Sequence, residues 1–273
     1  EVPLFEPRAA YRFLPREGRN SQPGDPAAGE NPTFGASINF YLGEGTGGRA
    51  QVMITTESGE QVRTLSTAAS NGLNRLVWDL RYESSSTPRL RTRPLEHSHR
   101  ELDSSGWRPP PDGGTVRPLA VPGLYRVTLA LEGHEEQSAW LEVLQDPESD
   151  ARASDMEAQL APQLELRELS DSTGALINRI EWVRKSLEDL EDRVGRNVRY
   201  GDVVTAGEIL DEVLIDLEMR LFDLRLTGGS AGQDTIRWPR QLWAKLSSLG
   251  GYSSGSDDRP TDQMLEVRDI YRE

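Results

Sequence analysis

The sequence predicts a chain with both β and α structure, a β-sandwich followed by an all-α domain built on a helical hairpin. Three observations predict it. Short segments of alternating apolar and polar residues, with turn signals between them, fill residues 35–145. Apolar residues then recur at spacings of three and four within residues 146–273, which is typical of helices. Capping boxes of the S/T-x-x-E type at Ser154 and Thr205 indicate where two of these helices begin.

Residues 1–34 differ from both of these parts. They are rich in Pro, Gly, Arg and Asn, and they show no sustained period of two or 3.6 residues. Proline fixes its own backbone and removes a hydrogen-bond donor, so a stretch of this kind favours neither helix nor strand. We expect an extended tether that lies along a surface, or a linker.

The strands of the sandwich are predicted from alternation between turns. They are expected at residues 36–42, 51–55, 62–65, 73–80, 124–131 and 138–143. In the first of them Ile38, Phe40 and Leu42 fall on one face. Trp78 and Trp140 alternate within their strands, which favours packing in the core. Six or seven short strands with regular turns are typical of an antiparallel sandwich of the immunoglobulin or fibronectin type.

Two rows of apolar residues with matching spacing predict the helical hairpin. The rows are Leu176, Ile180, Val183, Leu187, Leu190 and Val194, and then Leu210, Leu214, Leu217, Leu221 and Leu224. Spacings of four and three place each row along one helix face. Pro162 and Gly174 are expected to kink or interrupt the chain before the first row. Because a short connection joins the two rows, we expect the helices to pack antiparallel, with shorter helices at residues 239–249 and from Thr261 onward.

Charge and composition exclude several classes of function. The formal net charge is −14, and residues 146–273 carry 16 basic and 27 acidic side chains against 15 and 18 in residues 1–145. An acidic surface repels phosphate, so we expect neither a nucleic-acid partner nor adsorption to anionic lipid. No apolar run approaches the length of a membrane span, so direct insertion is not expected. The chain has no cysteine, which excludes disulfides, thiolate metal sites and cysteine nucleophiles.

No group of residues predicts catalysis, a cofactor or a metal. The glycine-rich run at residues 43–48 lies between two expected strands and no Lys follows it, so it favours a hairpin loop over a phosphate loop. His97 and His99 could bind a metal with a third ligand, but neighbouring arginines would repel the cation. The acidic clusters lack the spacing of a calcium loop, and no G-x-S-x-G elbow is present. We therefore predict no catalytic, cofactor-binding or metal-binding residue.

The long excursion at residues 82–121 of the predicted sandwich is the candidate for binding. Loops of this length inside compact domains usually bind something or carry no fixed structure. It brings basic residues and one tryptophan to an acidic protein, and arginine and tryptophan are typical anchors of protein interfaces. The candidate protein-interaction residues are Arg89, Arg91, Arg93, Arg100, Trp107 and Arg108. An insertion without a binding role remains the alternative interpretation.

Several stretches taken together resemble a bacterial family. They are residues 31–36 with 40–42 (NPTFGA and FYL), 58–65 (SGEQVRTL), 72–82 (GLNRLVWDLRY), 122–127 (PGLYRV) and 176–180 (LINRI). These stretches are similar to the C-terminal region of large secreted bacterial proteins with sortilin-like or BNR-repeat β-propellers, often labelled glycosyl hydrolases. The immunoglobulin-like part also resembles a module of the flagellar hook-capping protein. The resemblance covers roughly residues 5–273, but it carries over no catalytic residue, because the propeller is absent from this sequence.

These observations together favour a non-catalytic, extracytoplasmic interaction or scaffold module of a bacterium. One form of this hypothesis is a membrane-extrinsic subunit that stabilises a larger protein complex, in the periplasm or outside the cell. Another is the docking end of a β-propeller protein. The alternative is the accessory C-terminal region of a secreted β-propeller glycoside hydrolase, which would support the catalytic domain or bind glycans through an aromatic platform at Trp107. No cofactor is expected in either case.

Overall fold

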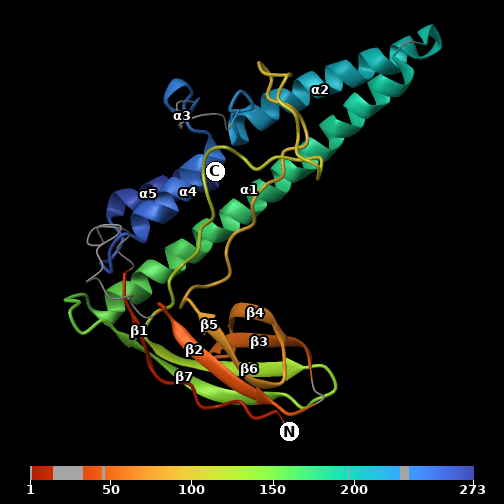
Figure 1. The fold of residues 1–273 in the computed structure, drawn as a ribbon. Coiled ribbons are helices and arrows are strands. Elements are labelled where there is room, and N and C mark those ends of the chain that lie inside the picture. The colour runs from red at the N-terminus through yellow and green to blue at the C-terminus, as the bar shows by residue number, and fades with distance from the viewer. Residues whose placement is uncertain (1, 15–32, 45–46, 196, 228–233) are drawn as a thin grey trace, which may run out of the picture. The chain divides into compact units, whose positions relative to one another are not determined.

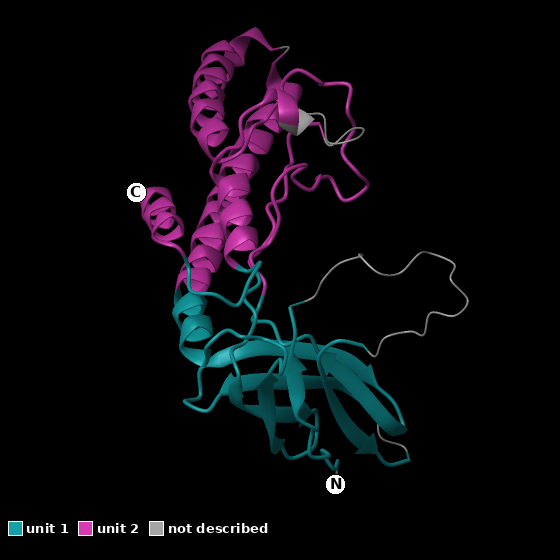
Figure 2. Ribbon diagram, turned by 90° about the vertical axis from the view of Figure 1, so that its left-hand side faces the viewer, with its two compact units in different colours: residues 1–83, 117–161, 254–260 teal, residues 84–116, 162–253, 261–273 magenta. Residues whose placement is uncertain are grey.

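The computed structural model describes residues 2–14, 33–44, 47–195, 197–227 and 234–273. Within them the chain divides into two compact units, which Figure 2 colours separately. Unit 1 contains residues 1–83, 117–161 and 254–260, and unit 2 contains residues 84–116, 162–253 and 261–273. Each unit buries apolar side chains of its own.

The main element of unit 1 is a curled, mixed sheet of five strands (Figure 1). In spatial order these are β1 (Ala10–Arg12), β7 (Gln137–Gln145), β6 (Gly123–Leu131), β3 (Gly48–Thr56) and β4 (Gln61–Ala69). The sheet is mixed because β1 lies parallel to β7, whereas the other neighbours are antiparallel. Arg12 of β1 is buried, where it forms an ion pair with Asp257, and its Nε donates to the carbonyl of Ala120 at 3.0 Å.

The remaining strands, β2 (Ala36–Leu42) and β5 (Gly72–Trp78), form an antiparallel ribbon of two. The inward residues of β2 are fully buried, as its alternation predicted. The indole ring of Trp78 is also buried and packs edge-on against the ring of Tyr125 at 5.2 Å between centroids. Each such side chain contributes roughly 1.5–3 kcal/mol when it is withdrawn from water.

The predicted immunoglobulin-like sandwich followed by an all-α domain is therefore wrong. Five of the strands share one sheet, and the other two make only a ribbon instead of a second full sheet. The alternation of side chains identifies a strand and its buried face, but it does not determine which neighbour the strand bonds. Unit 2 is not all-α either, because residues 84–116 belong to it and contain neither helix nor regular strand.

Residues 1–34, the expected tether, lie partly outside the described residues, because 15–32 are not described. The part before them lies along both sheets of unit 1. The N–H of Phe5 donates to the carbonyl of Asn39 at 3.0 Å, and the N–H of Tyr41 donates to the carbonyl of Pro3 at 3.1 Å. Residues 10–12 then pair with β7.

Helices dominate unit 2. They are α1 (Ala153–Val194, which begins in unit 1), α2 (Gly201–Leu221), α3 (Asp234–Arg237), α4 (Leu242–Ser253) and α5 (Asp262–Arg272), with a 3-10 turn η1 at Val198–Tyr200. The α1 helix continues through Pro162 and Gly174, so the predicted interruption is wrong. At Gly174 the missing side chain leaves α1 close to Trp243 of α4. Among the described residues, no helix combines the length and the apolar character needed to cross a bilayer.

The second half of α1 and the whole of α2 run antiparallel, side by side (Figures 1 and 2). Their inner residues join an apolar cluster that includes Leu90, Ile177, Ile180, Leu221, Phe222 and Trp243. A second cluster, formed by Val116, Leu166, Leu246 and Leu249, packs against side chains of α5. Unit 2 thus holds residues 84–116 and its helices around common apolar contacts.

Candidate functional site

Residues 84–116 of unit 2, the arginine-bearing segment, contain all six residues that the sequence predicted for binding. Side chains of α1 accept hydrogen bonds from the backbone of this segment, as a neighbouring strand does in a sheet. The N–H of Ser86 donates to Oδ1 of Asp171 at 2.6 Å, and the N–H of Arg89 donates to Oδ1 of Asn178 at 2.9 Å. The segment also folds back on itself, where Leu90 and Arg108 exchange backbone hydrogen bonds of 2.9 and 2.8 Å. Several of its backbone donors are thus satisfied without helix or sheet.

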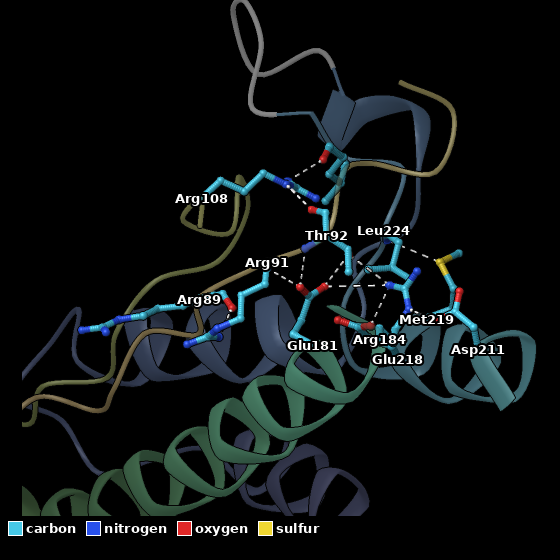
Figure 3. A network of polar contacts seen from close by, with 11 residues as sticks. Arg89, Arg91, Thr92, Arg108, Glu181, Arg184, Asp211, Glu218, Met219 and Leu224 are labelled. Atoms are coloured by element: carbon cyan, nitrogen blue, oxygen red, sulfur yellow. Dashed lines mark hydrogen bonds and ion pairs between the residues drawn. The ribbon is translucent and has the colours of Figure 1, made fainter. Parts of the chain in front are cut away.

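A polar cluster joins the segment to both helices of the pair. It consists of Thr92 and Arg108 from the segment, Glu181 and Arg184 from α1, and Asp211 and Glu218 from α2 (Figure 3). The carboxylate of Glu181 accepts from the N–H of Thr92 at 2.7 Å, from its hydroxyl at 2.9 Å, and from the N–H of Arg91. Glu181 is fully buried, so these bonds replace the water that its charge has lost.

Arg184 connects the two helices within this cluster. Its Nε donates to Oδ1 of Asp211 at 2.9 Å, and its Nη1 donates to Oε2 of Glu218 at 3.1 Å. The same Nη1 donates to the hydroxyl of Thr92 at 3.2 Å and lies 3.8 Å from Oε1 of Glu181. Burial lowers the pKa of Arg184, but the surrounding carboxyl groups outweigh burial and raise it overall. The guanidinium therefore stays charged.

Glu218 is the unusual titratable group of the cluster. Burial, followed by the nearby Glu181 carboxylate, raises the pKa of Glu218 to about 9, so its side chain carries a proton at neutral pH. Arg108 brings a second, partly buried cation, whose Nη1 donates to the carbonyl of Leu226 at 3.1 Å and whose Nε donates to that of Thr92 at 3.3 Å.

The hydrogen bonds and ion pairs of this cluster join the segment to α1 and α2. Nearby carboxyl groups, one of them with a raised pKa, also occur in catalytic sites. Here, however, the side chains of Glu181 and Glu218 are fully buried, and the Glu181 oxygens accept hydrogen bonds from the segment. These groups hold the arginine-bearing segment against α1 and α2.

The structure separates the predicted arginines into an internal group and an external group. Arg108 points into unit 2, where burial lowers its pKa, and it serves the polar cluster. Arg93 and Arg100 are exposed. The guanidinium of Arg89 lies 5.1 Å from the ring centre of Trp107, and that of Arg91 lies 4.1 Å from the ring centre of Trp182.

These external side chains form the arginine–tryptophan face, which we define as Arg89, Arg91, Arg93, Trp107 and Trp182. Arg91 and Arg93 also line a hollow of about 450 Å3 on unit 2, together with residues of α1 and α2. Trp182 is largely exposed, at 57% of its accessible surface, yet its ring is fixed beneath a guanidinium. Cations over aromatic faces attract one another electrostatically, by about 0.5–1 kcal/mol at exposed sites.

Sequence reasoning missed the α1 residues that hold this segment. A signal was present, because Ile177, Ile180, Glu181 and Arg184 follow the i, i+3, i+4, i+7 pattern of one helix face. All four are buried. Two charged residues that continue an apolar face indicate a buried ion pair, and buried charges need partners.

The other sequence candidates have different positions. The rings of His97 and His99 lie edge to face at 5.7 Å, and within the described part of the chain no group of three metal-binding side chains gathers. Trp140 is 44% exposed, so its predicted core position is wrong. It is opposite Arg126 in the β6–β7 register, on the outward face of the sheet, and the Arg126 guanidinium lies 5.0 Å from its ring centre.

No family model matches the chain, and no curated protein matches its sequence. The resemblance to the region that follows sortilin-like β-propellers therefore stays a prediction. What the chain does has to be inferred from its own side chains.

Proposed function

We propose that the chain is a non-catalytic protein-binding module that contacts its partner through the arginine–tryptophan face of unit 2. The observation that carries this proposal is the Arg91 guanidinium, fixed over the exposed ring of Trp182. Arginine and tryptophan are enriched among the residues that dominate interface energies. Side chains that are already ordered lose less entropy when a partner binds, which favours affinity.

The charge of this face indicates the chemistry of the partner. Three arginines stand on a chain whose net charge is −14, so they form a local basic surface within an acidic surrounding. Guanidinium groups bind carboxylates with two parallel hydrogen bonds. We infer a partner protein that presents Asp or Glu side chains, and we retain the hypothesis that the complex is a larger assembly outside the cytoplasm, to which this chain binds as an extrinsic subunit.

The alternative of a glycan-binding accessory region is less well supported by Trp107. A sugar stacks on an open aromatic face, and one face of this ring carries the Arg89 guanidinium at 5.1 Å. The two hypotheses differ in what Arg89 should do. If the partner is a protein, charge reversal at Arg89 should weaken binding, because it removes a contact with a partner carboxylate. If the ligand is a glycan, the same change should not weaken binding, because it uncovers the Trp107 ring for the sugar.

Site-specific cross-linking tests the proposed function. A photoreactive amino acid in place of Arg100, which is exposed on the same segment, is expected to capture a defined partner in extracts of the source organism. The double substitution Arg89→Glu with Arg93→Glu should abolish the product. The matched control is Arg8→Glu with Arg49→Glu, which makes the same charge change at exposed positions of unit 1. Equal cross-linking in both double variants would contradict the proposal.

A further inference from the structure

The helix pair of unit 2 leaves two rows of large apolar side chains uncovered. The rows repeat every seven residues, and they are Leu176, Val183 and Leu190 on α1, and Val203, Leu210 and Leu217 on α2. Each of these side chains is between 36% and 48% exposed. Single exposed apolar residues are ordinary, but two parallel rows of three are not.

The companion heptad positions, three or four residues away on the same helix faces, lie deeper. On α1 Ile180 is buried, and on α2 Leu221 is buried, both within the apolar cluster of unit 2. A helix with two apolar heptad rows normally buries both, because each row packs into a neighbouring helix. In the described part of α1 and α2 the companion positions pack within the unit, whereas the side chains of the two rows stay 36–48% exposed.

Between the two helices, near their connection, is a groove of about 340 Å3. Its apolar lining comes from Leu187 and Leu190 of α1 and from Val203 and Val204 of α2, with Gly207 adding space. Its charged lining is acidic throughout, and consists of Glu188, Glu191, Glu208, Asp211 and Glu212. The groove therefore offers apolar contacts between two edges of negative charge.

We propose that this groove and the rows beside it bind an amphipathic helix of another protein, with Leu-like anchors on one face and Lys or Arg beside them. Amphipathic helices bind apolar grooves through anchors at i, i+3, i+4 and i+7, which is the spacing that two heptad rows accept. The acidic edges attract basic side chains and raise the rate of encounter. The groove adjoins the arginine–tryptophan face, because Glu188, Glu191 and Asp211 also line the hollow beside Arg91 and Arg93, but its apolar lining and acidic edges suit a different kind of partner.

The same charges argue against a second copy of the chain as the occupant. Pairing two identical grooves would bring Glu188, Glu191, Glu208 and Glu212 of each copy close to their counterparts, with no basic residue in the lining to compensate. Like charges placed together across an interface are repulsive, and a basic helix removes that repulsion.

The test uses the full chain and two fluorescent helical peptides of about five turns. Both peptides carry leucines at the heptad positions, with lysines beside them in one and glutamates in the other. We expect the lysine peptide to bind, by fluorescence anisotropy, and to bind at least about tenfold more weakly at 0.5 M salt, because screening weakens exposed charge pairs. The glutamate peptide should not bind.

Two variants locate the binding. Glu191→Lys with Glu208→Lys and Glu212→Lys reverses three exposed charges of the groove and should weaken the lysine peptide by at least about tenfold. The matched control, Glu136→Lys with Glu142→Lys and Glu266→Lys, makes the same change in net charge away from the groove and the two rows, and should keep most of the affinity. Gly207→Leu, which fills the groove from α2, should also weaken binding while the salt dependence remains.

Three outcomes would overturn the proposal. The first is no binding of the lysine peptide at concentrations up to about 100 μM, well above the range of specific association. The second is equal binding of both peptides, or equal weakening in the groove variant and its control. The third is a concentration-dependent dimer, seen by sedimentation, that the groove variant abolishes, since this would assign the groove to a second copy of the chain.

Discussion

Glu181 of α1 accepts two hydrogen bonds from Thr92, one from its backbone N–H at 2.7 Å and one from its hydroxyl at 2.9 Å. This pair connects a segment without regular secondary structure to the second half of α1. Its effect extends to the surface, because Arg91, the neighbour of Thr92, lies over Trp182, the neighbour of Glu181. The buried contact between one pair of residues therefore sets the position of the exposed pair beside it.

Replacement of Glu181 should destabilise unit 2 strongly. Glu181→Ala removes the acceptor of three donors from the segment and leaves Arg184 with fewer partners in a buried place. Breaking a buried charge pair in this way costs about 3–5 kcal/mol. Urea denaturation followed by circular dichroism measures the loss. Glu188→Ala, on the exposed side of the same helix, is the control and should cost less than about 1 kcal/mol.

The raised pKa of Glu218 predicts how stability depends on pH. In the unfolded chain this carboxyl group is ionised above its ordinary pKa of 4.5, whereas in the folded protein it keeps its proton up to about pH 9. The folded state thus binds more protons in this window, and the contribution to the free energy of unfolding falls as pH rises, by as much as about 1.4 kcal/mol per pH unit.

Glu218→Gln tests this directly, because the amide imitates the protonated acid. The variant should unfold at a similar urea concentration to the wild type at the acidic end of the window, below about pH 5, where both chains are neutral at this position. It should become progressively more stable than the wild type as pH rises to 9. A difference that stays constant from pH 5 to pH 9 would mean that Glu218 is ionised in the folded protein.

The two classes of arginine in the segment should respond differently to truncation. Arg108→Ala removes donors to the carbonyls of Thr92 and Leu226 inside unit 2, and unsatisfied buried groups cost about 1–3 kcal/mol each. Arg100→Ala changes an exposed side chain and should alter stability by less than about 0.5 kcal/mol. Limited proteolysis should therefore cut residues 84–116 faster in the first variant alone. Equal cleavage rates would place Arg108 outside the contacts that hold the segment.

Local pattern predicted the elements of this chain better than their assembly. Residues 36–42 form the predicted strand, and their alternation identified the buried face correctly. The turn at residues 57–60 predicted the antiparallel pairing of β3 with β4, but the partner of β1 could not be predicted, because β1 pairs with a strand more than 130 residues later in the chain and parallel to it. Trp140 was misplaced for a related reason, since its face depends on how β7 lies in the sheet and both faces of a strand alternate equally well.

For the candidate site, too, the sequence predicted the residues but not their contacts. The sequence singled out the arginines and Trp107, because their residue types are typical of interfaces. It could not separate Arg108 from Arg91, since the difference lies in contacts with α1 and α2. Trp182, whose ring lies under the Arg91 guanidinium, belongs to a helix for which the sequence pattern predicted packing alone.

A matched pair of glycines in unit 1 tests the packing of the ribbon against strain of the backbone alone. Gly35 and Gly59 both have positive φ, at 119° and 88°, which glycine adopts without penalty and other residues rarely do. A Cβ at Gly59 would have no heavy atom of the protein within 4 Å, whereas a Cβ at Gly35 would overlap the carbonyl oxygen of Trp78. Trp78 ends β5 and lies opposite Ala36, the first residue of β2. Gly59→Ala should therefore cost about 1 kcal/mol from the backbone alone. Gly35→Ala should cost clearly more, because the Trp78 carbonyl belongs to the rigid backbone of β5 and the ribbon has to open. Equal losses in thermal or urea unfolding would show that the β2–β5 ribbon is not closed at Trp78 as described.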